Sequence, residues 1–166
     1  MEEKIQKQNV SNAGEYYVAA RLSALDFTVT VTLGRAEKYD ILACKNSNGK
    51  VYKFSVKTTQ LENAKKFMLS VKDEDGESDD FYYVFVRLSK DFSKEPDFWI
   101  IPSKIVCRLI KEASKKWMDG SGRNGKKHSD TLKLRSLPIE LTRGDVGYYE
   151  EGWAEKVKNT IKILRT

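Results

Sequence analysis

The sequence predicts an α/β protein in which a mixed β-sheet is flanked by helices. Three observations support this: a helical repeat near the start, a series of short strands rich in β-branched and aromatic residues, and a second amphipathic helix after them. One helix, five strands, another helix and a C-terminal helix, in that order, suit a sheet covered on its faces. The length of 166 residues fits a single domain over residues 1–166.

The first helix is predicted over residues 12–25. Val18, Leu22 and Leu25 recur at helical spacing, and Asn12 with Glu15 has the spacing of a capping box. Residues 1–11 are polar, so we expect a flexible N-terminus.

Alternating or continuous apolar residues mark the strands. The predicted strands are residues 28–33, 38–44, 51–58, 81–88 and 97–101, with a further short strand at 67–71. Residues 46–49 (NSNG) are a strong hairpin signal, which makes the strands on either side of them neighbours.

The last third of the sequence predicts a helix over residues 104–118, with Ser103 as its N-cap. Residues 119–130 form a glycine- and lysine-rich basic loop, and residues 131–137 are short and amphipathic. Trp153, Val157 and Ile161 lie at helical spacing and predict a C-terminal helix over residues 148–164.

Composition narrows the classes of function. The net charge of +6 favours a polyanionic partner such as nucleic acid. Two distant cysteines, Cys44 and Cys107, and one histidine do not make a zinc site. No apolar run is long enough to span a membrane and no signal peptide is visible, so we expect a cytoplasmic protein.

Three polar side chains lie where a core would favour apolar residues. Glu15 falls on the apolar stripe of the first helix, roughly 20° from Leu22 at about 100° per residue. It either points toward the sheet or serves the capping box, and both roles are compatible. Asp40 is embedded in a strand, which is unfavourable unless its carboxylate is paired, binds a cation or faces solvent from an edge strand.

Lys57 is the third of these side chains. Ser55 and Lys57 are two residues apart, so both point to one face of their strand. Because the hairpin joins this strand to that of Asp40, we expect Asp40 and Lys57 on the same face, with Glu15 arriving from the covering helix. Carboxylates together with one lysine suit a hard cation and a phosphate.

The segments GEYYVAARL, KYDILA and KFSVKTT, in this order around a hairpin, resemble the PD-(D/E)xK nuclease superfamily. FYYVFVRL and PDFWIIPSKIV are also similar, so the resemblance extends over about residues 14–153, and it is strongest to small phage and bacterial endonuclease-domain proteins. It implies a restriction-endonuclease-like core and hydrolysis of DNA phosphodiester bonds that depends on Mg²⁺, with Mn²⁺ as a substitute. Because nucleases that cut both strands often work as dimers, a homodimer is one expected assembly.

The resemblance assigns roles to individual residues. Asp40 matches the metal-binding aspartate, Lys57 the catalytic lysine and Glu15 the helical glutamate that some members use. Val56 matches the position whose backbone carbonyl completes the metal shell. Ser55 departs from the pattern, because it stands where a second acid belongs and its hydroxyl is a weak, neutral ligand.

A second set of residues is expected to contact the phosphate backbone: Arg123, Lys126, Lys127, His128 and Arg135. Three hypotheses remain open at this point. The chain is a metal-dependent DNA endonuclease, a DNA-binding or protein-interaction module with the same fold and an inactive site, or an interaction protein with no nucleic-acid role.

Overall fold

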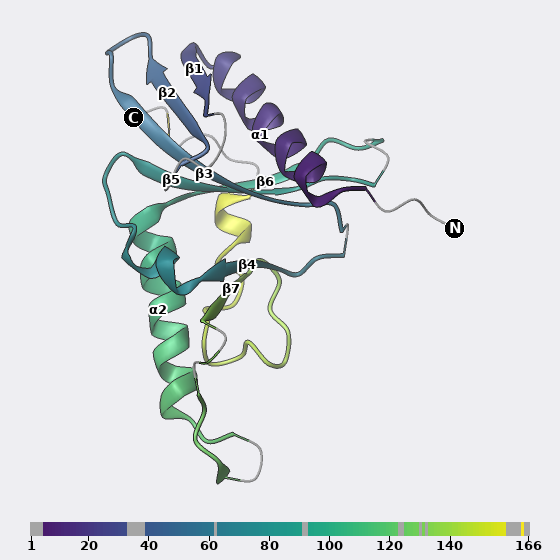
Figure 1. Cartoon of the computed structure of the whole chain (residues 1–166), viewed down its shortest axis with the longest axis vertical. Coiled ribbons are helices and arrows are strands. Elements are labelled where there is room, and N and C mark those ends of the chain that lie inside the picture. The colour runs from purple at the N-terminus through teal and green to yellow at the C-terminus, as the bar shows by residue number, and fades with distance from the viewer. Residues whose placement is uncertain are drawn as a thin grey trace.

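The computed structural model of the chain describes residues 5–32, 39–61, 63–90, 93–122, 125–129, 131, 133–158 and 164. A five-stranded sheet carries helix α1 (Lys7–Ser23) on one face. Helix α2 (Ser103–Asp119) and a two-stranded sheet of β4 (Lys66–Ser70) and β7 (Leu134–Pro138) lie on the other (Figure 1). The predicted α/β class, a mixed sheet flanked by helices, is confirmed.

The large sheet has the strand order β1-β2-β3-β5-β6. All neighbouring strands are antiparallel except β3 and β5, which are parallel. The bounds are Phe27–Val31 for β1, Ile41–Lys45 for β2, Val51–Thr59 for β3, Phe81–Arg87 for β5 and Asp97–Pro102 for β6. Each strand overlaps a segment that the sequence predicts, and the turn between β2 and β3 falls at residues 46–49 as expected. Gly49 in this turn has φ 70°, a conformation that glycine adopts without steric cost.

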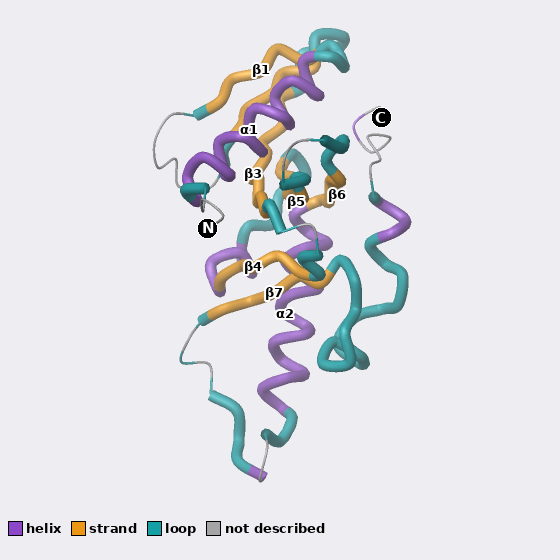
Figure 2. Tube along the Cα trace, turned by 90° about the vertical axis from the view of Figure 1, so that its right-hand side faces the viewer, coloured by secondary structure: helices purple, strands orange, loops and turns teal. Residues whose placement is uncertain are grey.

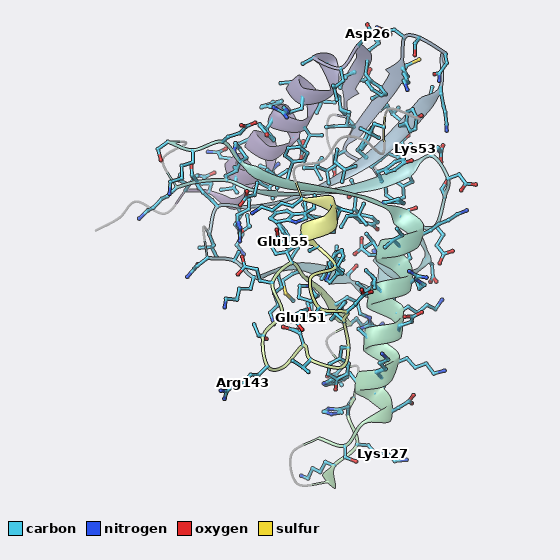
Figure 3. All side chains as sticks on the ribbon, turned by 180° about the vertical axis from the view of Figure 1, so that it is seen from behind. Asp26, Lys53, Lys127, Arg143, Glu151 and Glu155 are labelled. Carbon is cyan, nitrogen blue, oxygen red and sulfur yellow. The ribbon has the colours of Figure 1, made fainter. Side chains whose placement is uncertain are left out.

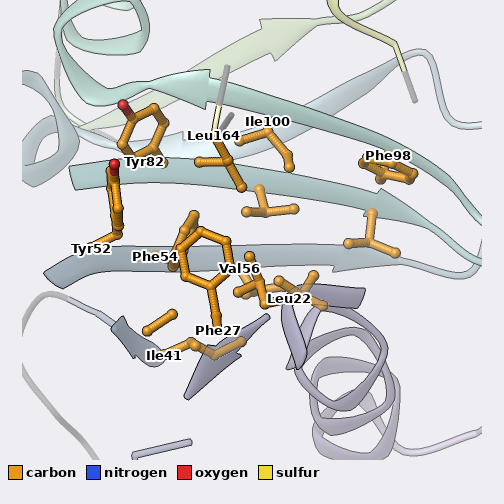
Figure 4. Close-up of a cluster of buried hydrophobic side chains, with 14 of the residues drawn as sticks. Leu22, Phe27, Ile41, Tyr52, Phe54, Val56, Tyr82, Phe98, Ile100 and Leu164 are labelled. Atoms are coloured by element: carbon orange, nitrogen blue, oxygen red, sulfur yellow. The ribbon is translucent and has the colours of Figure 1, made fainter. Parts of the chain in front are cut away.

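Alternation along β3 and β5 separates two apolar cores. Phe54 and Val56 face α1, where Leu22 packs over them (Figure 4). Phe85 faces the opposite side and packs with Val106 of α2. Since β5 contributes to both cores, it is buried over nearly its whole length, as its continuous apolar sequence predicts.

Helix α1 begins at Lys7 instead of the predicted residue 12. The carbonyl of Gln6 closes the first turn by accepting the N–H of Val10 at 3.2 Å. The straight-chain polar residues at this end are good helix formers, because they lose little side-chain freedom in a helix. The expected flexible N-terminus over residues 1–11 is therefore wrong from Lys7 onward, while residues 1–4 lie outside the described residues.

Helix α2 starts at Ser103, and Pro102 is the residue that precedes its first turn. Ser103 is therefore not the predicted N-cap. Its hydroxyl instead donates to the carbonyl oxygen of Ser78 and accepts the N–H of Ser78, both at 3.0 Å. This pair fastens the start of α2 to residues 71–80, a segment rich in Asp and Glu that begins with the short 3-10 helix η1 (Val71–Asp75).

The strand expected at residues 67–71 and the short amphipathic segment at 131–137 pair with each other as β4 and β7. They form a sheet of their own, separate from the large one (Figure 2). The outer edge of β7 is covered by side chains, because the Tyr149 hydroxyl donates to the carbonyl of Ser136 at 2.6 Å and Trp153 Nε1 donates to that of Pro138 at 3.0 Å. Covered edges of this kind do not attract further strands.

The predicted C-terminal helix over residues 148–164 is wrong for the described residues 148–158. These form turns and the 3-10 helix η3 (Glu155–Val157). Gly152 has φ 68°, a left-handed conformation that interrupts a right-handed helix. Residues 159–163 lie outside the described part of the chain, and Leu164 is buried beside Ile100 in the apolar cluster on the α1 side of the sheet (Figure 4). No helix among the described residues combines the length and apolarity needed to cross a membrane.

Candidate functional site

Asp40 lies directly before β2, at the point where this strand stops pairing with β3. Its N–H donates to the carbonyl of Phe54 at 2.8 Å, and its carbonyl accepts the N–H of Thr32 at 2.9 Å. Its carboxylate Oδ2 accepts the N–H of Val56 at 2.6 Å. The side chain therefore takes over, for one residue, the role of a backbone acceptor in the β2–β3 ladder.

Ser55 and Lys57 lie on the same sheet face as Asp40, as predicted, but this is the face that carries α2, whereas α1 with Glu15 covers the opposite face. The register pairs Ile41 with Phe54, so the preceding residue, Asp40, is opposite Ser55. Side chains alternate along a strand, which puts Lys57 on the face of Ser55. Ser55 is buried and Lys57 is half-buried. No ion pair of Lys57 is found in the part of the chain that the structure describes.

The backbone of Val56 faces the end of β2. Odd-numbered residues of β3 bond to the β5 side, as the N–H of Lys53 and the carbonyl of Thr59 show. Even-numbered residues bond to the β2 side, where Val56 donates its N–H to Asp40. In a strand, the N–H and C=O of one residue point to the same side. The carbonyl of Val56 is therefore directed toward the side on which the Asp40 carboxylate lies.

Glu15 approaches from α1, in the third turn of the helix. Because the helix starts at Lys7, no capping box with Asn12 forms, and Asn12 Oδ1 instead accepts from Gln8 Nε2 at 2.8 Å. Burial raises the pKa of the Glu15 carboxyl, and the negative charge of Asp40 raises it further. The Ser11 hydroxyl, which donates to Glu15 Oε1 at 3.4 Å, opposes this rise in pKa. The two carboxylates are therefore close enough to repel each other.

A contact that the sequence analysis missed sets the position of α1 on β3. Gly14 packs on Thr58 so closely that a Cβ on Gly14 would lie 1.9 Å from Thr58 Oγ1. A glycine in the middle of a helix was the available signal, since glycine is unfavourable there unless close packing requires it. The contact fixes the distance between the backbone beside Glu15 and the strand that carries Ser55 and Lys57.

The candidate ligand atoms around Asp40 are all oxygens, which is the type of atom that a hard cation binds. Two carboxylates, a backbone carbonyl and a hydroxyl are oxygen ligands of the kind that Mg²⁺ takes. The structure has no group of three or more Asp, Glu, His or Cys side chains able to hold a metal ion among its described residues. Glu15 and Asp40 would therefore carry the ionic part of the site, Val56 and Ser55 would supply neutral oxygens, and ordered water would complete the shell.

Replacement of Glu15 by glutamine tests the rise in the pKa of its carboxyl, which burial causes first and the charge of Asp40 second. A raised pKa means that folding favours the protonated form, and this contribution is fully present below the usual value of 4.5 and is lost as the pH rises through the folded value. Glu15→Gln should therefore raise the free energy of unfolding near neutral pH in EDTA, and should change it little below pH 4.5. Urea unfolding at both pH values measures this, with exposed Glu112→Gln on α2 as the matched control. An equal effect of Glu15→Gln at both pH values would contradict the raised pKa of Glu15.

The basic loop lies at the opposite end of α2 from the sheet. Figure 3 shows Lys127 at this tip, and the 17 residues of α2 span roughly 25 Å at about 1.5 Å per residue. Lys126 and Lys127 are exposed, as a phosphate contact requires. The His128 ring stacks on Trp117 with 4.0 Å between ring centres, so it holds the loop against the helix.

Arg135 does not belong to this exposed group. It is buried, and its Nε forms an ion pair with Glu74. A buried arginine keeps its partner because an unpaired charge in the interior is costly. The expectation that Arg135 contacts DNA phosphates therefore does not fit the structure, and Arg123 lies outside the described residues.

The fold is similar to that of a bacterial homing endonuclease of known structure. The similarity covers 96% of this chain and 92% of that one, with a TM-score of 0.53 and 10% sequence identity. No protein-family model matches the sequence, and no curated protein is detectably similar to it. At this level of identity, the comparison establishes a nuclease-like fold.

Proposed function

We propose that this protein is a metal-dependent DNA endonuclease whose active site is formed by Asp40, Glu15 and Lys57. The observation that carries the proposal is the approach of Glu15 on α1 to Asp40 at the end of β2, where burial and, after it, the charge of Asp40 raise the pKa of Glu15. Two carboxylates held together against their mutual repulsion are typical of a site that is completed by a cation. The likeness of the fold to a homing endonuclease supports the same conclusion.

Each residue has a defined task in this proposal. Asp40 and Glu15 hold Mg²⁺, with the carbonyl of Val56 and the hydroxyl of Ser55 as neutral ligands. A cation held by these residues would supply the positive charge that lowers the pKa of a water molecule and offsets charge on the phosphate. Lys57, on the same strand face as Ser55, orients the attacking water and donates to a phosphate oxygen. Lys126 and Lys127 hold the DNA backbone farther along the molecule.

A second function is favoured by one observation. Asp40 Oδ2 already accepts the N–H of Val56, and Ser55 stands where a second acid would strengthen a metal site. An inactive module that binds DNA or a protein with the same fold would keep Asp40 for the strand hydrogen bond alone. The two functions differ in whether the site takes up a divalent cation.

Calorimetric titration of Mn²⁺ and Mg²⁺ into the protein, with and without duplex DNA, distinguishes them. The endonuclease proposal predicts binding by the wild type and about tenfold tighter binding by Ser55→Asp, because affinity rises with the number of charged ligands. Ser55→Asn is the matched control, with the same shape and no charge. If no cation binds in the presence of DNA, and Ser55→Asp behaves like Ser55→Asn, the endonuclease proposal is wrong. DNA binding at low salt would then favour the inactive module.

A further inference from the structure

A cavity of about 330 Å³ lies on the side of α2 that faces β7. Its walls come from the second half of α2, from Ser129 and Thr131 in the connection that follows, from β7 and from residues 144–149 after β7. This volume is at the lower end of the range of about 300–1,000 Å³ for small-molecule sites, so it suits one compact planar group. The cavity is separate from Asp40 and Lys57, and neither of them lines it.

Three aromatic side chains line the cavity, and two of them are held in place by other contacts. Trp117 lines the cavity, and His128 stacks on its ring. Tyr149 is fixed by the hydrogen bond from its hydroxyl to the carbonyl of Ser136. Tyr148 is half-buried beside it. Trp117 keeps 39% of its surface exposed, so a ligand can reach it. Rigid aromatic walls are suited to stacking on a flat ring.

Three exposed cations lie on the segments that adjoin the cavity, although none of them lines it. Lys126, Lys127 and Arg143 are exposed, and no carboxylate pairs with them within the described residues. Figure 3 shows Lys127 at the tip and Arg143 on the segment after β7. Asp145 lines the cavity, but it is buried, and its carboxylate is used locally, where it accepts the N–H of Thr142 at 2.9 Å. Aromatic walls beside unpaired cations fit a ligand that joins a planar ring to a phosphate.

We propose that this cavity binds an unpaired nucleobase of a DNA strand whose phosphates lie along Lys126, Lys127 and Arg143. The proposal rests on the proposed function, since it requires that the protein binds DNA. Extrusion of a base costs least where the base is already unpaired, so the cavity would direct the protein to DNA with a bulged or mismatched base. Base stacking on aromatic side chains is tolerant of sequence, because every base has a flat face.

The test compares a paired DNA duplex with the same duplex that carries one bulged 5-iodouracil, in EDTA so that no strand is cut. Fluorescence anisotropy should show tighter binding of the bulged duplex. Irradiation should cross-link the iodouracil to a peptide that contains Trp117 or Tyr148, identified by mass spectrometry. Trp117→Ala should weaken binding of the bulged duplex about tenfold more than binding of the paired duplex, which loses only the stack of Trp117 on His128 that holds the basic loop. Trp117→Phe, which keeps a flat ring, should retain most of the preference.

Lys127→Ala separates this inference from the function on which it rests. Loss of one phosphate contact should weaken binding of both duplexes equally. The slope of the logarithm of the binding constant against the logarithm of the salt concentration should become shallower by about one. If both duplexes bind equally well and the cross-link maps elsewhere, the cavity proposal is wrong while the DNA-binding function stands. If neither duplex binds at low salt, both are wrong. If free deoxynucleoside monophosphate competes as well as the bulged duplex, the ligand is a free nucleotide and the strand proposal is wrong.

Discussion

Asp40→Asn is expected to abolish divalent-cation binding and DNA cleavage while leaving the protein folded. In the wild type, the backbone nitrogen of Val56 lies 2.6 Å from Asp40 Oδ2. Asparagine keeps an oxygen that can accept the same N–H. It lacks the negative charge that the cation site requires. Mutation of groups that merely support metal ligands costs about 10–100-fold in affinity or activity, so loss of a ligand should cost about 100-fold or more. Calorimetry with Mn²⁺ and a plasmid-nicking assay with Mg²⁺ measure the two effects.

Asp40→Ala separates the two roles of this carboxylate. Alanine removes both the charge and the acceptor, so the partly buried N–H of Val56 loses its bond, at a cost of about 1–3 kcal/mol. Asp40→Ala should therefore be less stable than Asp40→Asn in urea unfolding, although both lose cation binding. If the two variants are equally stable, the hydrogen bond to Val56 does not hold the strand end. If Asp40→Asn still binds Mn²⁺ as the wild type does, the cation lies elsewhere.

The arrangement of Asp40, Ser55 and Lys57 could be predicted from sequence because local rules determine it. The NSNG turn makes β2 and β3 a hairpin, and a hairpin fixes which residues are opposite one another. Alternation along β3 then assigns Ser55 and Lys57 to one face. The register in the structure agrees, with Ile41 opposite Phe54.

The features that could not be predicted depend on distant partners. Arg135 reads as a basic residue of an exposed segment, but its environment is set by Glu74, 61 residues away in sequence. The C-terminal segment has apolar residues at helical spacing, yet Trp153 is used to cover the edge of β7. Tertiary contacts override local periodicity in both cases.

The position of Glu15 depends both on local sequence rules and on a distant tertiary contact. Its place on the apolar stripe of α1 follows from helical periodicity. Its closeness to Asp40, however, depends on how deeply α1 sits on β3, and that depth is set by the contact between Gly14 and Thr58. The proposed active site therefore requires a residue without a Cβ at position 14, although Gly14 itself takes no part in the chemistry.

Gly14→Ala is expected to destabilise the protein and to weaken cation binding together. The new Cβ would lie 1.9 Å from Thr58 Oγ1, 2.7 Å from its Cγ2 and 2.8 Å from its Cβ, so α1 must move away from β3. Overpacking of this kind costs about 1–3 kcal/mol. Alanine also favours the helix by about 1 kcal/mol, which reduces but does not reverse the loss. Urea unfolding gives the stability, and Mn²⁺ calorimetry reports the displacement of Glu15 from Asp40.

Two further variants show whether the contact with Thr58 is the cause. Ala20→Gly, at an exposed position of the same helix, measures the helix-propensity part alone. Thr58→Ala removes a hydroxyl that is buried without a hydrogen-bond partner among the described residues, so by itself it should cost little stability. Thr58→Ala removes the two atoms of this side chain beyond Cβ, so in the double variant with Gly14→Ala it should restore part of the stability and part of the Mn²⁺ affinity. The stabilities of the single and double variants should then depart from additivity by about 0.5–3 kcal/mol. Since Thr58 Cβ would still be too close, the recovery should be incomplete. Strictly additive effects of the two substitutions would show that another contact sets the depth of α1, and normal Mn²⁺ binding by Gly14→Ala would mean that Glu15 is not a ligand.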